Sequence, residues 1–422
     1  MKNFKKGIAN NKSLVENFSY LSLLQIFNLV LPLLSYPYLI RVLGVPTYGK
    51  IIFAQAIISY FAIFVGFGFN VSATKEVSIH RDDKTKLSEI VSSVLIIKTL
   101  IFCISLVVLI PILFFFKEAS ENKILYLTTL WICIYEILFP NFYFQGIEKM
   151  KYSSVISLIV RSIFVVLIFV FIHSESDYLY VPILNLLGAF LVGLSSIYII
   201  FYSHKLKFYV PGLKVLKFYF NESIPVFLSN ASIQIYVSTN KVLIGLFLGM
   251  TEVSYYDMGE KILNILRIPQ GILSQTVFPK ISHDKDIAFV KKIFYYSLIL
   301  NGILFLLLFV FSDLIIGILG GQQMLPSKWV VRILGMTLPI VAISNIFGML
   351  VLIPFGFNKL FSRIIMFSGA IFIFQFSILW VTNWITIYSL SIITVITEGF
   401  VSFLMYFYCI KNNLWRTRSI TI

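Results

Sequence analysis

The turn that decides the fold lies at residues 39–51, which read Leu-Ile-Arg-Val-Leu-Gly-Val-Pro-Thr-Tyr-Gly-Lys-Ile. Two glycines and a proline stand here between two long apolar runs, and Gly and Pro are the strongest local markers of a turn. Part of the turn returns 205 positions later, where Leu43-Gly44 is matched by Leu248-Gly249. This recurrence predicts that the chain was built from two copies of one half.

The composition of the 422-residue chain predicts a membrane protein. Hydrophobic residues make up 59% of the chain, charged residues make up 13%, and the mean hydropathy is +0.91. Soluble domains carry about 25% charged residues, so no soluble core would hide this much apolar surface. Cys103, Cys133 and Cys409 all lie in apolar runs. We interpret them as small hydrophobic residues rather than as disulfide partners or metal ligands.

About twelve apolar segments are long enough to cross a bilayer as helices. Their expected limits are 18–40, 50–70, 90–114, 123–144, 153–173, 179–202, 222–247, 255–278, 292–312, 328–353, 361–381 and 385–409. A signal peptide also begins with a basic segment before an apolar run. The first run is too long for that and no Ala-x-Ala-like site follows it, so we expect a retained first span.

The basic residues predict the orientation of these spans. If the N-terminus is cytoplasmic, 23 of the 34 Lys and Arg residues fall in cytoplasmic segments, six fall on the opposite side and five fall inside spans. The positive-inside rule therefore places both termini in the cytoplasm. The same rule explains most of the net charge of +15, so this charge does not indicate nucleic-acid binding.

Three matches at nearly one spacing predict two parallel six-span repeats. Besides the glycine turns, Lys75 is matched by Lys280 after the second span of each half, and Gly146–Lys149 is matched by Gly356–Lys359 after the fourth. We expect the boundaries to be 1–203 for the N-terminal half, 204–221 for a cytoplasmic linker and 222–422 for the C-terminal half. Neither a Gly-x-x-x-x-Gly-Lys-[Ser/Thr] loop nor a His/Cys metal cluster occurs, so we expect no cofactor and no nucleotide hydrolysis.

Basic residues inside or beside the spans are the candidates for substrate binding. Lys241, Lys261 and Arg267 lie in spans seven and eight, and Arg41 lies at the equivalent place in the first half. Intramembrane charges are costly and usually face a cavity or a partner. A cavity lined by Arg and Lys suits an anionic group such as a diphosphate. The alternative is that these side chains snorkel to the membrane interface. This alternative stays open for Arg41 above all. Arg267 lies near mid-span, far from the interface, so a cavity role is favoured there.

Acidic residues inside the spans are the candidates for ion coupling. Glu136, Glu260 and Glu398 lie in spans four, eight and twelve. A carboxyl group in a low-dielectric environment can exchange protons or hold a cation. A structural pair with a basic residue on a neighbouring helix is an equally weighted alternative for Glu136 and Glu398.

Three stretches of the chain resemble a known family. They are Pro37–Gly44 with Tyr48-Gly49, Asn141–Lys151, and Leu248-Gly249 with Val253–Tyr256. In these stretches the chain resembles the Wzx-type O-antigen and polysaccharide-unit flippases, within the multidrug/oligosaccharidyl-lipid/polysaccharide exporter superfamily. The chain departs from the pattern at Ser254, where a glycine is expected before the tyrosine.

The resemblance implies an all-α integral membrane protein with twelve transmembrane helices in two six-helix lobes, a V-shaped transporter with alternating access. It implies a flippase rather than an enzyme, which moves undecaprenyl-diphosphate-linked oligosaccharide from the cytoplasmic to the outer leaflet of the bacterial inner membrane. An ion gradient would drive the movement. The implied partners are the lipid-linked oligosaccharide and membrane lipids, with a polysaccharide polymerase and a chain-length regulator, and no nucleic acid.

Two alternatives stay open at this point. A multidrug or cation antiporter of the same superfamily would need an acidic, apolar pocket, whereas the charges in the central spans lean basic. A polysaccharide polymerase belongs to another class and would need a large extracytoplasmic loop. The longest predicted loop on that side, residues 313–327, is about fifteen residues long and argues against a polymerase.

Overall fold

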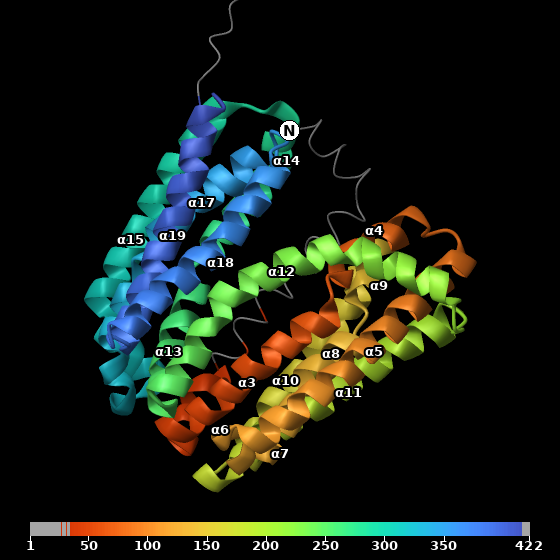
Figure 1. The fold of residues 1–422 in the computed structure, drawn as a ribbon, viewed down its shortest axis with the longest axis horizontal. Coiled ribbons are helices and arrows are strands. Elements are labelled where there is room, and N and C mark those ends of the chain that lie inside the picture. Colours follow the sequence, from red (N-terminus) through yellow and green to blue (C-terminus); the bar gives the residue numbers. More distant parts are fainter. Residues whose placement is uncertain (1–26, 28–30, 32–33, 416–422) are drawn as a thin grey trace, which may run out of the picture. The chain divides into compact units, whose positions relative to one another are not determined.

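The computed structural model describes Phe27, Leu31 and residues 34–415, except for the side chains of residue 153 and of five residues between 232 and 237. These residues form helices joined by short connections, and none of them forms a strand. The chain divides into unit 1 (Met1–Ala231) and unit 2 (Ser232–Ile422). Figure 1 colours it from red through green to blue along the sequence. Most of the predicted first span, 18–40, lies outside the described residues.

The first continuous described stretch of unit 1 is helical over residues 34–43. The elements that follow are α3 (Val45–Gly66), α4 (Phe69–Ile79), α5 (Lys84–Phe115), α6 (Lys117–Glu121), α7 (Lys123–Thr129), α8 (Trp131–Leu138), α9 (Asn141–Gly146), α10 (Met150–Phe171), the 3-10 helix η1 (Glu175–Leu179), α11 (Tyr180–Tyr198) and the π-helical turn η2 (Ile199–Ser203). The long helix α12 (Leu213–Phe247) carries the chain from unit 1 into unit 2.

Unit 2 repeats this order of long and interrupted helices. Its elements are α13 (Met250–Leu266), α14 (Ile268–Asp284), α15 (Ile287–Gly320), the 3-10 helix η3 (Gln322–Ser327), α16 (Lys328–Gly335), α17 (Thr337–Asn345), the π-helical turn η4 (Ile346–Leu352), α18 (Asn358–Val381) and α19 (Ile387–Lys411). The packing within the two units also corresponds. In unit 1, α7 packs on α3 and on α11, and in unit 2, α16 packs on α13 and on α19.

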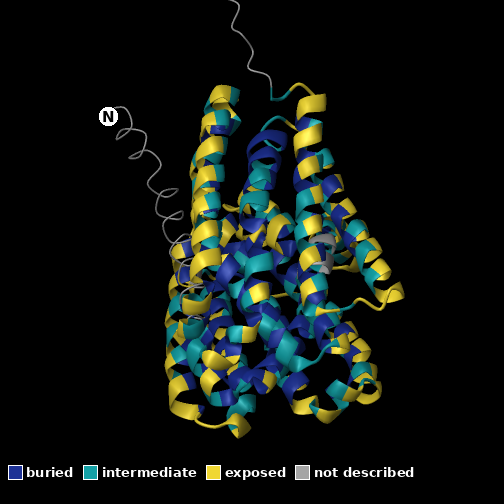
Figure 2. Ribbon diagram, turned by 90° about the vertical axis from the view of Figure 1, so that its left-hand side faces the viewer, coloured by how far each residue is buried: buried dark blue, intermediate teal, exposed yellow. Residues whose placement is uncertain are grey.

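The α15 helix is apolar on its outer face and carries polar residues on its buried face, which is the arrangement that lipid favours. The outer face of α15 carries an exposed apolar stripe made of Tyr295, Ile299, Ile303, Leu306, Val310, Leu314 and Ile318. Its buried face includes Ser297, Asn301 and Ser312. Figure 2 shows the same mixture of exposed and buried positions along individual helices. Exposure of such a long apolar stripe is unfavourable in water and favourable in hydrocarbon. This face of α15 therefore faces lipid.

Nine helical segments of the described residues are long and apolar enough to cross a membrane. This finding confirms the predicted all-α membrane fold, whereas the count of twelve helices in two lobes stays a prediction. Neither α12 nor the α13–α14 pair is among the nine. Both carry polar and charged residues such as Asn240, Lys241 and Asp257. A hydropathy threshold does not detect a membrane-spanning helix whose buried face carries polar and charged residues.

Two helices extend beyond the membrane spans that hydropathy predicts. The span predicted at 292–312 lies within α15, which is 34 residues long, and the span predicted at 90–114 lies within α5, which is 32 residues long. The extra turns begin at Asp83 and Asp286, whose side chains each accept hydrogen bonds from two backbone N–H groups of the first turn. An aspartate N-cap satisfies these donors outside the hydrocarbon, where charged residues are tolerated.

The paired glycine turns adopt the same backbone conformation. Gly44 has φ 76° and ψ 162° before α3, and Gly249 has φ 110° and ψ 178° before α13. Side chains other than glycine rarely adopt this conformation, so each glycine fixes the angle between its helices. One-residue interruptions also correspond, at Leu130 between α7 and α8 and at Met336 between α16 and α17. The structure therefore agrees with the recurrence seen in the sequence.

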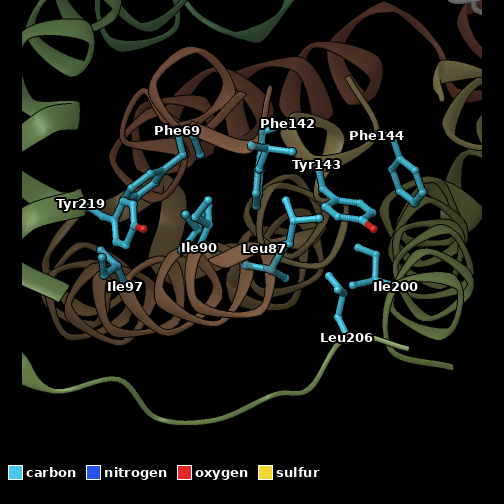
Figure 3. Close-up of a cluster of buried hydrophobic side chains, with 14 of the residues drawn as sticks. Phe69, Leu87, Ile90, Ile97, Phe142, Tyr143, Phe144, Ile200, Leu206 and Tyr219 are labelled. Atoms are coloured by element: carbon cyan, nitrogen blue, oxygen red, sulfur yellow. The ribbon is translucent and has the colours of Figure 1, made fainter. Parts of the chain in front are cut away.

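The core of unit 1 is aromatic and lies where α4, α5 and α9 meet the beginning of α12. Figure 3 shows Phe69, Leu87, Phe142 and Tyr143 in this cluster. Phe67, which has a positive φ of 42°, stacks on two phenylalanines of α12. Burial of several large aromatic rings stabilises the cluster, since each buries roughly 150–250 Å².

Close helix contact at Gly193 generates the first prediction. A Cβ atom at Gly193 of α11 would overlap Leu138 of α8, so Gly193→Ala should destabilise unit 1 by roughly 1–3 kcal/mol through overpacking. The matched control is Gly302→Ala in α15, where a Cβ atom meets no atom within 4 Å. There alanine should be neutral or stabilising, since it favours helix by up to ~1 kcal/mol. Thermal unfolding of the purified variants measures both, and equal melting temperatures would contradict the close packing.

Candidate functional site

Four charged side chains of α12 and α13 form a network in unit 2. Lys241 Nζ lies 3.0 Å from Asp257 Oδ1 and 2.6 Å from Glu260 Oε2. Lys261 forms an ion pair with the other carboxylate oxygen of Asp257. Two ammonium groups and two carboxylates alternate, so the quartet of Lys241, Asp257, Glu260 and Lys261 carries no net charge when all four groups are ionised.

Helix geometry brings three members of this quartet together. Asp257, Glu260 and Lys261 stand at positions i, i+3 and i+4 of α13, which share one face of a helix. The fourth member comes from α12, six residues before the end of that helix. Asp257 is only 3% exposed. Burying a charge costs several kcal/mol unless it is paired, and here each carboxylate has an ammonium partner.

A second polar cluster adjoins the quartet and ties α12 and α13 to α19. Asn240 donates from Nδ2 to Tyr256 Oη at 2.8 Å and to Thr394 Oγ1 at 2.7 Å. Asn240 and Tyr256 each neighbour a quartet residue in the sequence. The Asn240 Oδ1 atom is buried without a partner among the described residues. These contacts fix the C-terminal part of α12 against the N-terminal part of α13 and against α19.

Arg267 lies at the break between α13 and α14. Pro269, two residues further on, has no N–H to continue the helix ladder. The Arg267 side chain donates from Nη2 to Thr337 Oγ1 at 2.8 Å, and Thr337 stands at the break between α16 and α17. The Arg267 Nε atom is buried and has no hydrogen-bond partner among the described residues. The guanidinium group therefore retains capacity to bind an acceptor.

Arg267 has two carboxylates near it in unit 2, Glu398 of α19 and Glu260 of α13, and it interacts electrostatically with both. Neither carboxylate lies within ion-pair distance of Arg267. Among the described residues, Glu398 has no hydrogen bond and no ion pair of its own. Arg267 therefore lies close enough to both carboxylates to interact with them electrostatically, without a direct ion pair to either.

A buried amide network lies on α14, just after Arg267 in the sequence. Gln270 Oε1 accepts hydrogen bonds from Ser297 Oγ at 2.5 Å and from Asn301 Nδ2 at 2.9 Å. Ser274 Oγ donates to Asn345 Oδ1 at 2.5 Å. These contacts join α14 to α15 and α17 with polar groups inside an apolar unit. Hydrogen bonds between transmembrane helices contribute about 0.6 kcal/mol each on average and fix how helices pair.

Unit 1 holds a different arrangement of intramembrane charge. Lys98 of α5 is fully buried and donates to the backbone oxygen of Glu136 at 2.6 Å. The same Nζ atom lies 3.6 Å from Glu136 Oε2. A Cβ atom at Gly66 would lie 3.3 Å from that carboxylate, so α3 approaches it closely. Glu136 is therefore part of a structural ion pair in this conformation, and Arg41 is exposed at the end of the helix over residues 34–43.

The structure brings together three of the residues proposed from sequence, Lys241, Glu260 and Lys261. Arg267 interacts at longer range with Glu260 and Glu398, whereas Glu136 and Arg41 belong to unit 1. Asp257, the centre of the quartet, was not among the site residues predicted from the sequence. Its signal was the i, i+3, i+4 spacing of charges on an intramembrane helix. The Thr337 contact had no sequence signal, because it depends on tertiary packing.

Comparison with known structures shows which class of membrane protein has this fold. The chain has the fold of a multidrug resistance MATE family transporter in an inward-facing conformation, with a TM-score of 0.70 and 14% identity, covering 94% of this chain and 96% of the other. It matches the lipid II flippase MurJ with a TM-score of 0.69 and 16% identity, covering 93% and 87%. The chain is therefore a multi-pass membrane protein with the fold shared by these transporters.

The family follows from the sequence match. The chain belongs to the polysaccharide biosynthesis protein family, whose pattern it matches over residues 14–285. A curated relative is "Putative O-antigen transporter" of Escherichia coli (strain K12), which is 25% identical over 367 residues and covers 86% of this chain and 88% of its own length.

The quartet generates the second prediction. Asp257→Asn leaves two lysines beside one carboxylate, so it should destabilise the protein by roughly 3 kcal/mol. A second substitution, Lys261→Met, restores neutrality and should recover most of the loss. The matched control is Asp313→Asn, because Asp313 pairs with Lys328 at an exposed site and should cost less than about 1 kcal/mol. Unfolding of the purified variants measures these changes, and a double variant less stable than Asp257→Asn alone would contradict the network.

Proposed function

We propose that this protein is a flippase for lipid-linked polysaccharide repeat units. The carrying observation is its membership of the polysaccharide biosynthesis protein family, together with a curated O-antigen transporter relative that matches most of both chains. The fold shared with MurJ, itself a lipid II flippase, is consistent with this function. The protein is a transporter rather than an enzyme. The carried lipid is undecaprenyl diphosphate, and the sugars are those of an O-antigen or capsule.

Arg267 binds the diphosphate of the head group in this proposal. Its guanidinium group has a free buried donor at Nε and no carboxylate within ion-pair distance. Arginine matches phosphate geometry with two parallel donors, and a low-dielectric surrounding strengthens such bonds. The half-buried amide of Asn345, which already accepts a hydrogen bond from Ser274, supplies a further hydrogen-bonding group for sugars.

The quartet couples transport to ions. Lys241 is held by both Asp257 and Glu260 in this conformation. Protonation of Glu260 would remove one of the two carboxylates and release part of the Lys241 charge for an anionic ligand. Return of the carboxylate would then expel that ligand. Lys241 and Lys261 therefore contribute to head-group binding only after their carboxylate partners change state, and Glu398 serves as a second site of protonation.

The proposal includes the membrane location, the architecture and the partners of the protein. The protein lies in the bacterial inner membrane with both termini in the cytoplasm, as the distribution of basic residues predicts. Twelve helices form two lobes that open alternately to each side. Arg41 lies at the outer rim of the first lobe, and Glu136 is a further ion site whose pairing with Lys98 changes between states. A polysaccharide polymerase and a chain-length regulator are the proposed protein partners.

Removal of the Arg267 charge generates the third prediction. Arg267→Ala should lower export at least about tenfold, since a charge-assisted bond to phosphate contributes more than ~1.4 kcal/mol. The measurement is surface polysaccharide in a deletion strain that expresses each variant at equal membrane level. Arg332→Ala is the matched control, because the Arg332 guanidinium stacks on Phe309 and Trp329 and bonds Ser312. Wild-type export from Arg267→Ala would remove Arg267 from the head-group site.

Removal of the coupling carboxylates generates the fourth prediction. Glu260→Gln and Glu398→Gln cannot exchange a proton, so each should abolish the stimulation of transport by an imposed ion gradient. Proteoliposomes with a proton gradient or a sodium gradient, applied separately, measure this stimulation. Glu252→Gln, in the first turn of the same helix α13, should respond like wild type. Full stimulation of both variants under the gradient that drives the wild type would exclude these carboxylates from coupling.

A further inference from the structure

A separate pocket of unit 2 lies between α15, α17 and α19. Its volume is roughly 580 Å³, and Phe294, Phe347, Phe403 and Tyr406 are among its lining residues. None of the quartet residues lines it, and neither Arg267 nor Glu398 does. It is therefore distinct from the proposed transport site. Pockets of ~300–1,000 Å³ are large enough to bury a small organic ligand.

The walls of this pocket suit a hydrocarbon chain. Phe403 is 59% exposed, and Tyr295, which belongs to the lipid-facing stripe of α15, is 61% exposed. The pocket is thus continuous with a surface that lipid covers. Gly399 also lines it, and a Cβ atom at Gly399 would meet no atom within 4 Å. The glycine therefore leaves open space on α19 that a chain can fill.

One end of the pocket carries a cation. Lys291 lines it, and its Nζ atom lies 5.6 Å from the centre of the Trp415 ring. Lys98, Lys241 and Lys261 are each paired with a carboxylate. Lys291, by contrast, has no ion pair within the described part of the chain. Tryptophan favours the membrane interface, and the positive-inside rule assigns this end of α15 to the cytoplasm. Basic pockets between transmembrane helices on that side bind anionic lipid head groups.

We propose that this pocket binds one anionic phospholipid of the cytoplasmic leaflet. An acyl chain lies against the aromatic side chains and Gly399, and the phosphate group pairs with Lys291. Bilayer phospholipid is in large excess at this face, which favours it over a rarer lipid by mass action. The bound lipid stabilises the contact of α15 with α17 and α19. This inference does not depend on the proposed transport function.

Native mass spectrometry of the full chain in detergent tests the proposal. Phosphatidylglycerol and phosphatidylethanolamine with identical acyl chains are titrated separately, and the bound copies are counted. The wild type should prefer phosphatidylglycerol. Lys291→Gln should lose this preference, with about tenfold weaker phosphatidylglycerol binding, since one charge-assisted bond is lost. Lys292→Gln, which alters the exposed neighbouring lysine, should bind like wild type. Equal binding of the two lipids by the wild type would overturn the proposal.

A filling substitution tests the pocket itself. Gly399→Leu should lower binding of both lipids, because the side chain occupies the space of the acyl chain. Gly302→Leu is the matched control, since this glycine of α15 also faces open space but does not line the pocket. Size-exclusion chromatography checks that both variants fold. Unchanged lipid binding by a folded Gly399→Leu would overturn the proposal, and Lys291→Gln decides the matter if Gly399→Leu does not fold.

Photo-crosslinking distinguishes the occupants in membranes. A benzophenone amino acid at Phe403 should give an adduct of the mass of one phosphatidylglycerol in vesicles that contain phosphatidylglycerol and phosphatidylethanolamine. A crosslink to a second copy of the chain, or to another segment of the same chain, would show that protein fills the pocket. Either crosslink in place of the lipid adduct would overturn the proposal.

Discussion

The structure depends on one constraint: hydrocarbon offers no hydrogen bonds, so polar groups must turn inward and find partners within the protein. The α15 helix shows this directly, with an apolar stripe outside and Ser297 and Asn301 inside. Lys98 shows it for a charge, since it is fully buried and engages both the backbone and the carboxylate of Glu136. Inward-facing polarity is what places the charged quartet inside unit 2 and the Lys98–Glu136 pair inside unit 1.

The two units share a plan and differ in chemistry. The glycine turns at Gly44 and Gly249 and the interruptions at Leu130 and Met336 recur at nearly one spacing. Unit 1 contains a simple ion pair, whereas unit 2 contains the neutral quartet, Arg267 and the amide network. Protonation of Glu260 would give the quartet a net positive charge and still leave Lys241 paired with Asp257, whereas protonation of Glu136 would leave Lys98 without a carboxylate partner. This asymmetry favours unit 2 as the place where ligand binding and ion coupling meet.

Much of the fold could be predicted from the sequence because its signals are local. Apolar length indicated the spans, and the Leu-Gly turns indicated the repeat, whose backbone conformation depends on glycine alone. Apolar length does not locate the helix ends at Asp83 and Asp286, where the helices extend beyond the predicted spans. The sequence predicted separate cation and carboxylate candidates, whereas Lys241, Lys261 and Glu260 belong to one network centred on Asp257. Side-chain partners such as Asp257 and Thr337 depend on how helices pack, and hydropathy carries no information about that packing.

The central claim is that the protein moves a lipid-linked oligosaccharide between leaflets. The most direct measurement follows the leaflet position of such a lipid in proteoliposomes, with and without the purified full chain, by its accessibility to a membrane-impermeant sugar-modifying reagent. The account predicts that the protected pool becomes accessible only with the protein present, and faster under an ion gradient. A protected pool that stays inaccessible in liposomes containing folded protein, with the gradient applied, would contradict it.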